Sequence, residues 1–384
     1  ATLSPDDIQT FAGKLQNNGV VVLGEARFAT TENIRYLVAK PRMQKYIDYA
    51  AEIYGIYLDY MDKQDIYVYS IDESFIDATD YLQIYGKTPK EYAKMLIEEI
   101  ARRTHIPATA GIGTNLYLAK IALDITAKKC PDRIGYLDER TFRETLWIHR
   151  PLTDFWGIAK GISNRLAKKG IYDMQGITRC PEEILYREFG VNAELIIDHA
   201  WGRESCTMED IKNYKSKSRS VSNSQILFKD YSYDQARIVI EEMIRSGCFE
   251  MMRRKVITNK VSITVGYSKE VHAPTGGRMK MRETTNLPKI IVPYALQLYE
   301  KTTARNMPIR RLGIGFEDVC DEGCEGYDLF TNWEEVKREK KLARATLELQ
   351  TKFGKNAIIM ASDLQEGATL IERNKLIGGH NADD

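Results

Sequence analysis

The period of the hydrophobic pattern changes twice along the chain, and this change constrains the fold more than any other feature. Strand-like and helix-like segments mix over residues 33–151, but from Leu152 to about Arg203 the pattern is helical throughout. A polar, Lys/Ser-rich stretch follows at 207–218, and mixed segments return over 219–318. Because one hydrophobic core does not extend over 384 residues, the pattern predicts an α+β multidomain protein.

The first mixed region is expected to contain a hairpin and several helices. Ile66–Ile71 is rich in β-branched and aromatic residues and predicts a strand, with Phe75–Ala78 as its antiparallel partner. Asp72, Glu73 and Ser74 would then lie at the bend. We expect the helices to pack on one face of an antiparallel sheet. The remaining predicted elements are a helix after Pro41, a helix from Pro89 to about Thr104, a strand from Ala108 to Gly113 and a helix from Asn115 to Lys129.

The helical region carries a pattern that is typical of phosphate binding. Gly157, Ile158, Ala159, Lys160 and Gly161 precede a second short segment at 164–171. Two short helices joined by a glycine-containing turn can direct backbone amides at a DNA phosphate, as helix-hairpin-helix units do. A plain helical subdomain is the alternative interpretation.

The second mixed region carries most of the positive charge. Between Lys212 and Arg282 there are fifteen Lys/Arg and six Asp/Glu, a net charge of +9, so that the rest of the chain carries −8. This asymmetry suggests a polyanionic partner, although a solvated basic face would look the same. The predicted elements, in the order β-α-β-α-β, are Ser220–Phe228, Ser232–Arg254, Lys260–Tyr267, Pro288–Thr303 and Arg310–Asp318, followed by an amphipathic helix at Trp333–Phe353.

The composition excludes several classes of protein. With 43% hydrophobic and 28% charged residues, the chain is not largely disordered. No apolar run approaches eighteen residues, so we expect no membrane-spanning helix and no membrane partner. The first seven residues are not typical of a secretory signal. Six dispersed cysteines favour a reducing cytoplasm, and Cys320 with Cys324 lacks the second pair that a zinc site needs. We expect a cytoplasmic monomer.

Asp72 and Glu73 are the first candidates for chemistry. Adjacent strand residues point to opposite faces, so two neighbouring carboxylates converge on one cation only where the backbone bends. The predicted hairpin supplies that bend. One or two carboxylates with water and substrate phosphate suit Mg²⁺. A polar turn without function is the alternative.

The run Tyr69-Ser70-Ile71-Asp72-Glu73-Ser74-Phe75-Ile76-Asp77 resembles the second catalytic motif of Y-family translesion DNA polymerases of the bacterial DinB/UmuC type. Four further segments resemble landmarks of the same family, and the resemblance spans roughly residues 33–384. These segments are Ala39–Met43 with Tyr46, Gly111–Asn115, Leu118–Ala122 with Lys128, and Ser218–Ser222.

The resemblance implies the architecture of a right-hand polymerase with a partial palm and fingers, a helical thumb and an α+β little finger. The implied divisions are an atypical N-terminal segment at 1–32, the palm at 33–151, the thumb at 152–206, a linker at 207–218, the little finger at 219–318 and a C-terminal tail at 319–384.

The resemblance also implies an activity, namely template-directed addition of deoxynucleoside triphosphates to primer-template DNA during lesion bypass and DNA repair. Two Mg²⁺ ions would support the transfer, with Asp72 bridging them and Glu73 holding the ion near the primer end. Lys128 and Arg27 would contact the nucleotide. The residues implied to contact the DNA backbone are Gly157, Ile158, Ala159, Lys160, Gly161, Arg219, Ser220 and Ser222.

One family element has no counterpart in residues 1–32. It is the first motif, a strand with a metal-binding Asp followed by an aromatic steric gate. Glu25, after the apolar run Val20–Leu23, is the one carboxylate placed to substitute, and a surface turn acid is its simpler interpretation. Two ions held by one carboxylate pair should bind poorly. We therefore expect impaired catalysis, with a non-catalytic DNA- and clamp-binding adaptor as the alternative function.

Gly326-Tyr327-Asp328-Leu329-Phe330 resembles the sliding-clamp motif of bacterial polymerases. Tyr327, Leu329 and Phe330 would be its anchors for an apolar groove. Ordinary packing of an apolar pair is the alternative.

Overall fold

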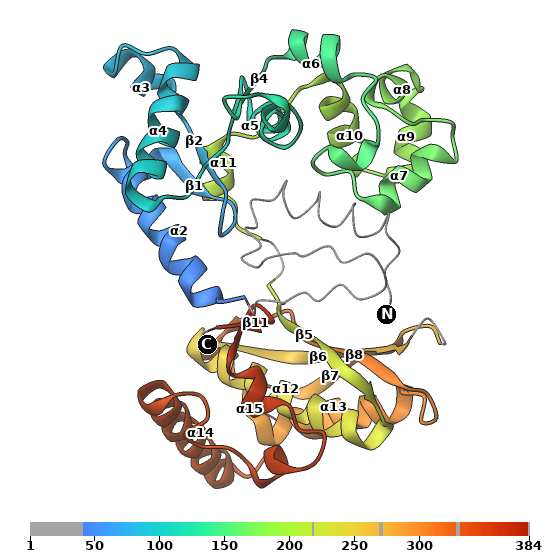
Figure 1. Ribbon diagram of the computed structural model, residues 1–384. Helices are drawn as coiled ribbons and strands as arrows, with labels where there is room; N and C mark the ends of the chain where they lie inside the picture. The colour runs from blue at the N-terminus through green and yellow to red at the C-terminus, as the bar shows by residue number, and fades with distance from the viewer. Residues whose placement is uncertain (1–40, 217–218, 269–271, 328–330, 383–384) are drawn as a thin grey trace, which may run out of the picture. The chain divides into compact units, whose positions relative to one another are not determined.

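The computed structural model describes residues 41–216, 219–268, 272–327 and 331–382 (Figure 1). The predictions for residues 1–32 lie outside these ranges. None of the described helices combines the length and apolar character that a bilayer crossing demands.

A short antiparallel hairpin forms where the sequence predicts one. β1 (Ile66–Val68) pairs with β2 (Ser74–Ile76), and Val68 lies opposite Ser74. The bend covers residues 70–72, so both strands are shorter than predicted. The hairpin follows α2 (Met43–Leu58) and η1 (Lys63–Asp65) and precedes α3 (Thr79–Ile84) and α4 (Pro89–Thr104).

The prediction of one antiparallel sheet for this region is wrong for the described residues. β3 (Ala110–Gly113) pairs in parallel with β4 (Ile134–Leu137), a strand that was not predicted, and the hairpin forms a separate sheet. A parallel pair needs a crossover of about a dozen residues, usually helical. The predicted helix at Asn115–Lys129 is that crossover, as α5 (Leu116–Ile121), the π-helical turn η2 (Ala122–Thr126) and η3 (Ala127–Lys129).

The helical character predicted for 152–203 is confirmed. These helices share one core with α5, which includes Leu118 of α5 and Leu166 of α7. After α6 (Glu139–Leu146), the elements are η4 (Leu152–Asp154), α7 (Lys160–Ala167), α8 (Met174–Arg179), α9 (Glu182–Phe189) and α10 (Asn192–Trp201).

The stretch 207–218 was predicted as an irregular linker, and its first half is instead a helix, α11 (Met208–Asn213). Thr207 and Asp210 form a reciprocal capping box, in which each side chain accepts the other residue's backbone N–H. A capping box satisfies two of the amides that a helix start leaves without partners. This local stabilisation explains a helix in a segment without an apolar period.

All five elements predicted over 219–318 are confirmed, and one strand was missed. The order along the chain is β-α-β-β-α-β, and the strands form an antiparallel sheet in the order β5-β8-β6-β7. The strands are β5 (Val221–Tyr231), β6 (Val256–Tyr267), β7 (Thr275–Thr285) and β8 (Ile309–Glu317), and the helices are α12 (Tyr233–Arg253) and α13 (Pro288–Thr302).

Both helices cover the same face of this sheet. Gly247 of α12 lies directly over Phe316 of β8, where a Cβ atom would come within 2.3 Å of the phenyl ring. Glycine therefore allows the helix to lie close to the sheet. The residues that alternate with the buried ones on each strand form the opposite, open face.

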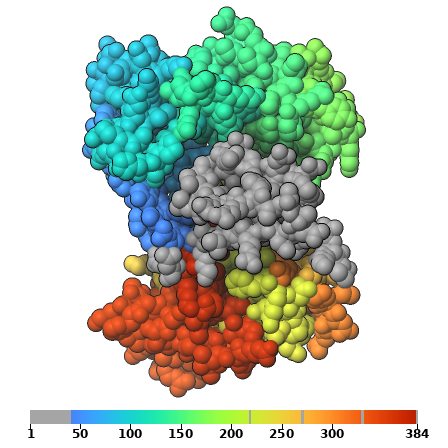
Figure 2. All heavy atoms as spheres, in the orientation of Figure 1, coloured from blue at the N-terminus to red at the C-terminus, as the bar shows by residue number. Residues whose placement is uncertain are grey.

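The C-terminal segment packs on this second domain rather than extending from it. The predicted helix α14 (Trp333–Phe353) has its predicted bounds, and it buries Val336 and Ala343 against a cluster that includes Leu287 and Phe249. Figure 2 shows the red C-terminal residues lying against the yellow and orange elements. The shorter elements are β9 (Cys320–Asp321), η6 (Glu322–Cys324), η7 (Ala361–Leu364), α15 (Leu370–Arg373), β10 (Leu376–Ile377) and β11 (His380–Asn381).

Candidate functional site

The bend of the first hairpin brings Asp72 and Glu73 to the end of β1 and β2. The backbone amides of Tyr69 and Ser70 both donate to the Glu73 carbonyl, at 3.0 and 3.1 Å, and close the turn. The Ser70 hydroxyl donates to the Asp72 carboxylate at 2.7 Å. Asp72 is exposed and Glu73 half-buried. The hairpin thus places one carboxylate in solvent and its neighbour against the protein.

Glu73 is held by a lysine that the sequence analysis did not assign to the site. Lys120 Nζ donates to both Glu73 carboxylate oxygens, at 2.8 and 2.9 Å, and to Asp124 Oδ1 at 3.0 Å. Lys120 is 8% exposed. Burial alone would lower its pKa, but the hydrogen bonds from Glu73 and Asp124 outweigh burial and raise the pKa above its usual value. Lys120 is therefore a buried, charged ammonium between two carboxylates.

Two glycines set the position of this lysine. A Cβ atom on Gly111 would lie 2.2 Å from the Ala119 carbonyl oxygen, and one on Gly113 would lie 2.1 Å from the Ala119 amide nitrogen. Helix α5 therefore rests directly on β3, as only glycine permits. Asn115 caps α5 by accepting the Leu118 amide at 2.8 Å. The run Gly111–Asn115 thus lets α5 pack directly on β3 and caps the start of α5, and together these contacts place Lys120 beside Glu73.

The helix changes its winding directly beyond Lys120. The π-helical turn Ala122–Thr126 includes Asp124 and leads to the short η3 that carries Lys128. Single π turns within helices are frequent at functional sites. Lys128 itself is exposed and has no ion-pair partner among the described residues. The other nucleotide-contact candidate, Arg27, lies outside the described residues, as does Glu25.

An aromatic cluster connects the hairpin to the helical region. Trp156 Nε1 donates to the Tyr69 hydroxyl at 3.0 Å, and both rings contact Phe75. The Tyr69 ring also lies 5.8 Å from Lys120 Nζ. These contacts fix the hairpin end beside the loop that begins at Gly157.

The carboxylates present suit one hard cation. Asp72 and Glu73 offer oxygen ligands, and each carboxylate has about four lone-pair positions, so the two that Lys120 occupies leave Glu73 with coordination capacity. Among the described residues no cluster of three or more His, Cys, Asp or Glu side chains is arranged for a metal ion. A Mg²⁺ ion with few protein ligands completes its shell with water and phosphate. The two carboxylates therefore fit one Mg²⁺ ion whose remaining ligands are water and substrate phosphate.

The glycine-containing loop before α7 exposes four of its five predicted DNA-contact residues. Gly157, with a φ of +87°, Ala159, Lys160 and Gly161 are exposed. Ile158 is different, because its side chain is buried and its amide donates to the Phe155 carbonyl at 3.1 Å. Ile158 thus anchors the loop rather than facing solvent. Within the described residues no side chain caps α7, so its first amides have no side-chain acceptor.

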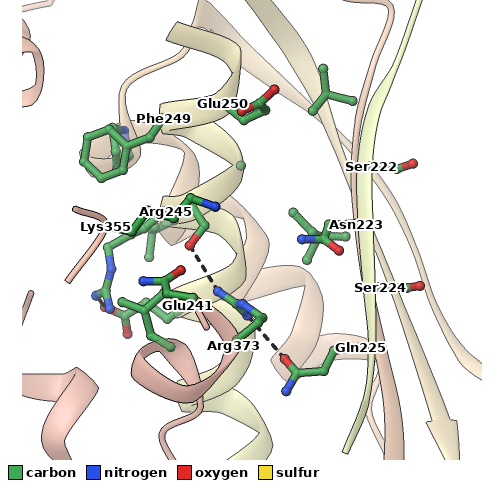
Figure 3. A pocket seen from close by; sticks show the side chains of 18 of the residues that line it. Ser222, Asn223, Ser224, Gln225, Glu241, Arg245, Phe249, Glu250, Lys355 and Arg373 are labelled. Carbon is green, nitrogen blue, oxygen red and sulfur yellow. Dashed lines mark hydrogen bonds and ion pairs between the residues drawn. The ribbon is translucent and has the colours of Figure 1, made fainter. Parts of the chain in front are cut away.

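The open face of the second sheet is built from small polar residues and a basic edge. One row across the sheet runs Ser222, Gly315, Ser262, Arg278, and the next brings Ser224, Gly313 and Thr264 together. Figure 3 shows Ser222 and Ser224 on the side of β5 that faces away from α12. Among the predicted contacts, Ser220 and Ser222 are exposed, and Arg219 is exposed beside Asp321 at 3.5 Å. The outward residues of the edge strand β7 are Arg278, Lys280 and Arg282.

The groove between β5, α12 and the C-terminal segment is crossed by polar contacts within the protein. Arg373 donates to Gln225 Oε1 and to Ser246 Oγ, and Asn223 and Gln225 point toward α12 (Figure 3). Glu242, fully buried, accepts the Thr369 amide and hydroxyl. These contacts hold α15 in place, so the groove is a structural joint.

The clamp-motif residues are only partly described. Tyr327 is half-buried, with its hydroxyl 3.2 Å from Thr285 Oγ1 and its ring 5.0 Å from the Trp333 ring. Leu329 and Phe330 lie outside the described residues.

Comparisons with known proteins agree with the motifs. The chain matches the impB/mucB/samB family over residues 12–124 and the C-terminal domain of that family over residues 218–329. It is 29% identical to the putative UV-damage repair protein UvrX of Bacillus subtilis, over 94% of this chain and 84% of that protein. It is 28% identical to DNA polymerase IV 2 of the same organism, over 90% and 82%.

Two further matches cover shorter stretches. The DNA repair protein homolog YobH of Bacillus subtilis is 31% identical, over 51% of this chain and 88% of that protein. The chain superimposes on a Y-family DNA polymerase chimera, Dbh-Dpo4(243-245)-Dbh, with a TM-score of 0.55 and 20% identity, over 73% of this chain and 78% of the other. The structural match supports the right-hand polymerase fold.

Proposed function

Because the chain belongs to the impB/mucB/samB family of Y-family DNA polymerases, we propose that it is a translesion DNA polymerase with its catalytic centre at Asp72 and Glu73. The single observation that supports this assignment is the hairpin bend that carries Asp72 and Glu73, with Glu73 bound by the buried Lys120.

In this proposal Asp72 and Glu73 hold Mg²⁺ at the primer terminus. Bound Mg²⁺ favours ionisation of the primer 3′-oxygen and stabilises the charge that develops on the transferred phosphate. Asp72 is exposed and, among the described residues, is held by the Ser70 hydroxyl alone, whereas Glu73 is fixed in orientation by the buried Lys120. Lys128, exposed at the end of the crossover, would bind the triphosphate of the incoming deoxynucleotide, together with Arg27.

Two surfaces would hold the DNA backbone. The start of α7, at Lys160 and Gly161, has amides without a side-chain cap, and an N-terminus of this kind attracts phosphate. The open sheet face offers Ser222 and the row beside it, where Gly313 and Gly315 leave the surface low enough for close approach of a sugar-phosphate backbone. Contacts of this type carry no sequence information, which suits an enzyme that accepts any template.

Turnover by this chain should be slow. Two ions need more ligands than Asp72 and Glu73 supply, and the described residues contain no arranged third carboxylate. The same observation favours the second candidate function, a DNA- and clamp-binding adaptor on the polymerase fold. Leu329 and Phe330 would anchor the clamp in either case, with Tyr327 bracing the base of the motif against Trp333.

A primer-extension assay on the 384-residue chain separates the two functions. Slow, Mg²⁺-dependent extension that disappears in Asp72→Asn and persists in Asp80→Asn supports the polymerase. Asp80 is a suitable control because it is an exposed carboxylate in the first turn of α3. Salt-dependent DNA binding without any extension would support the adaptor and overturn the polymerase assignment.

A further inference from the structure

The proposed mechanism uses Lys120 only to orient Glu73 and gives no role to the positive charge of its ammonium. Lysines are almost never fully buried unless they are paired. All three N–H groups of the Lys120 ammonium are used, two by Glu73 and one by Asp124, at 2.8 to 3.0 Å. A side chain committed in this way is part of the site rather than a solvated helix residue.

The charges of the cluster show what Lys120 contributes. Glu73 and Asp124 carry two negative charges and Lys120 one positive charge, a net charge of −1, and Asp72, adjacent to Glu73 in the sequence, brings the sum to −2. This is the charge that one divalent cation neutralises. Without Lys120 the same groups would carry −3. The Lys120 ammonium therefore neutralises one of these negative charges whether or not a metal ion is bound.

Resting on the proposed function, we propose that Lys120 competes with the divalent cation for Glu73, so that the site binds the cation weakly until the nucleotide triphosphate supplies further ligands. The ammonium lies within 3 Å of both Glu73 oxygens, and an ion bound to the same carboxylate would lie roughly 5 Å from Nζ. A divalent and a monovalent charge at that separation repel each other strongly, even with the screening of a partly exposed site.

Lys120 cannot easily move away from an arriving ion. Its side chain is 9% exposed, its helix rests on β3 through Gly111 and Gly113, and the Tyr69 ring lies 5.8 Å from Nζ. The second bond, to Asp124 four residues further along the chain, holds the ammonium from its own segment. The fold therefore keeps Lys120 in a position where it competes with an arriving cation for Glu73.

The test measures Mn²⁺ binding to the full chain by electron paramagnetic resonance, without DNA or nucleotide. We expect Lys120→Met to bind Mn²⁺ at least about tenfold more tightly than the unmodified chain, because the cluster gains one net negative charge at Glu73. Lys129→Met is the matched control. It removes the same charge from an exposed lysine in η3, and it should change the affinity by less than about threefold.

Lys120→Arg supplies the conservative comparison, since it keeps the positive charge and should stay within about threefold of the unmodified chain. Circular dichroism verifies that each variant is folded, and Lys120→Gln replaces Lys120→Met if the latter does not fold. Mn²⁺ affinity that is unchanged or weaker in the folded neutral variant overturns the proposal.

This outcome is separable from that of primer extension. A gain in Mn²⁺ affinity in a chain that never extends a primer would retain the role of Lys120 and reject the polymerase assignment. Normal extension without any gain would reject only the role of Lys120.

Discussion

The joint between the C-terminal segment and the second domain gives a stability prediction with a definite magnitude. Arg245 of α12 pairs with Asp363 of η7, whose side chain is 1% exposed. Arg245 also pairs with Glu241 at 2.7 Å and is itself 12% exposed. Arg245→Met would leave the Asp363 carboxylate buried, with a hydrogen bond from the Met360 amide at 2.7 Å.

Removing one partner of a buried ion pair costs about 3–5 kcal/mol. We expect Arg245→Met to lower the free energy of unfolding by about 3 kcal/mol, the lower end of this range. Asp363 keeps its hydrogen bond from the Met360 amide, and the joint can partly open to water. For a unit of about 150–250 residues, each kcal/mol corresponds to about 2–4 °C, so Tm should fall by about 6–12 °C. Differential scanning calorimetry of the full chain measures the shift.

Arg253→Met on the same helix is the matched control. Its ion pair with Glu250 is at the surface and is worth less than about 1 kcal/mol. Adding Asp363→Leu to Arg245→Met should restore part of the loss, because no buried charge is then left unpaired. Equal, small shifts for Arg245→Met and Arg253→Met would refute this account of the joint.

Three further predictions concern packing, pH and DNA. Gly111→Ala should destabilise the chain by about 3 kcal/mol in urea denaturation, because its Cβ atom would overlap helix backbone, whereas Gly55→Ala, with no described atom within 4 Å, should stabilise α2 by about 0.5–1 kcal/mol. Burial lowers the pKa of His199 below its unfolded value of about 6.5, so the stability due to the neutral imidazole is present above that pH and is lost as pH falls through the lower folded pKa. His199→Gln should flatten the dependence of Tm on pH below about 6.5; an unchanged slope would contradict this. Arg278→Ala with Lys280→Ala should reduce the salt dependence of log Kd for duplex DNA by about 1 to 2 units in fluorescence anisotropy, and an unaltered slope would remove the sheet face from the DNA interface.

Elements with local start signals were predictable from the sequence. Helix α4 begins at Pro89 because Thr88 and Glu91 form a capping box, and α12 follows Ser232 for the same reason. Such signals lie within four residues of each other, so they can be read without knowledge of the fold.

Pairings between distant segments were not predictable in the same way. The parallel partner of β3 is the four-residue strand Ile134–Leu137, and its pairing depends on how the crossover packs. Strand β7 was missed because Arg278, Lys280 and Arg282 on its open face and its two glycines give it little apolar character.

The candidate site shows the same difference between local signals and long-range contacts. Asp72 and Glu73 became candidates because they are adjacent and a bend was predicted between two strand-like runs, and the resemblance of Tyr69–Asp77 to a family motif then favoured them over a polar turn. Lys120 was missed because its partner Glu73 lies 47 residues away, although its spacing of four from Asp124 was a local signal.

The central claim is that Asp72 provides a ligand for catalytic metal at a primer terminus, and single-nucleotide incorporation under single-turnover conditions tests it most directly. We predict that Asp72→Asn lowers the Mg²⁺-dependent rate at least about a thousandfold, the equivalent of about 4 kcal/mol, while DNA affinity stays within about threefold. Incorporation at the unmodified rate by Asp72→Asn would contradict the claim.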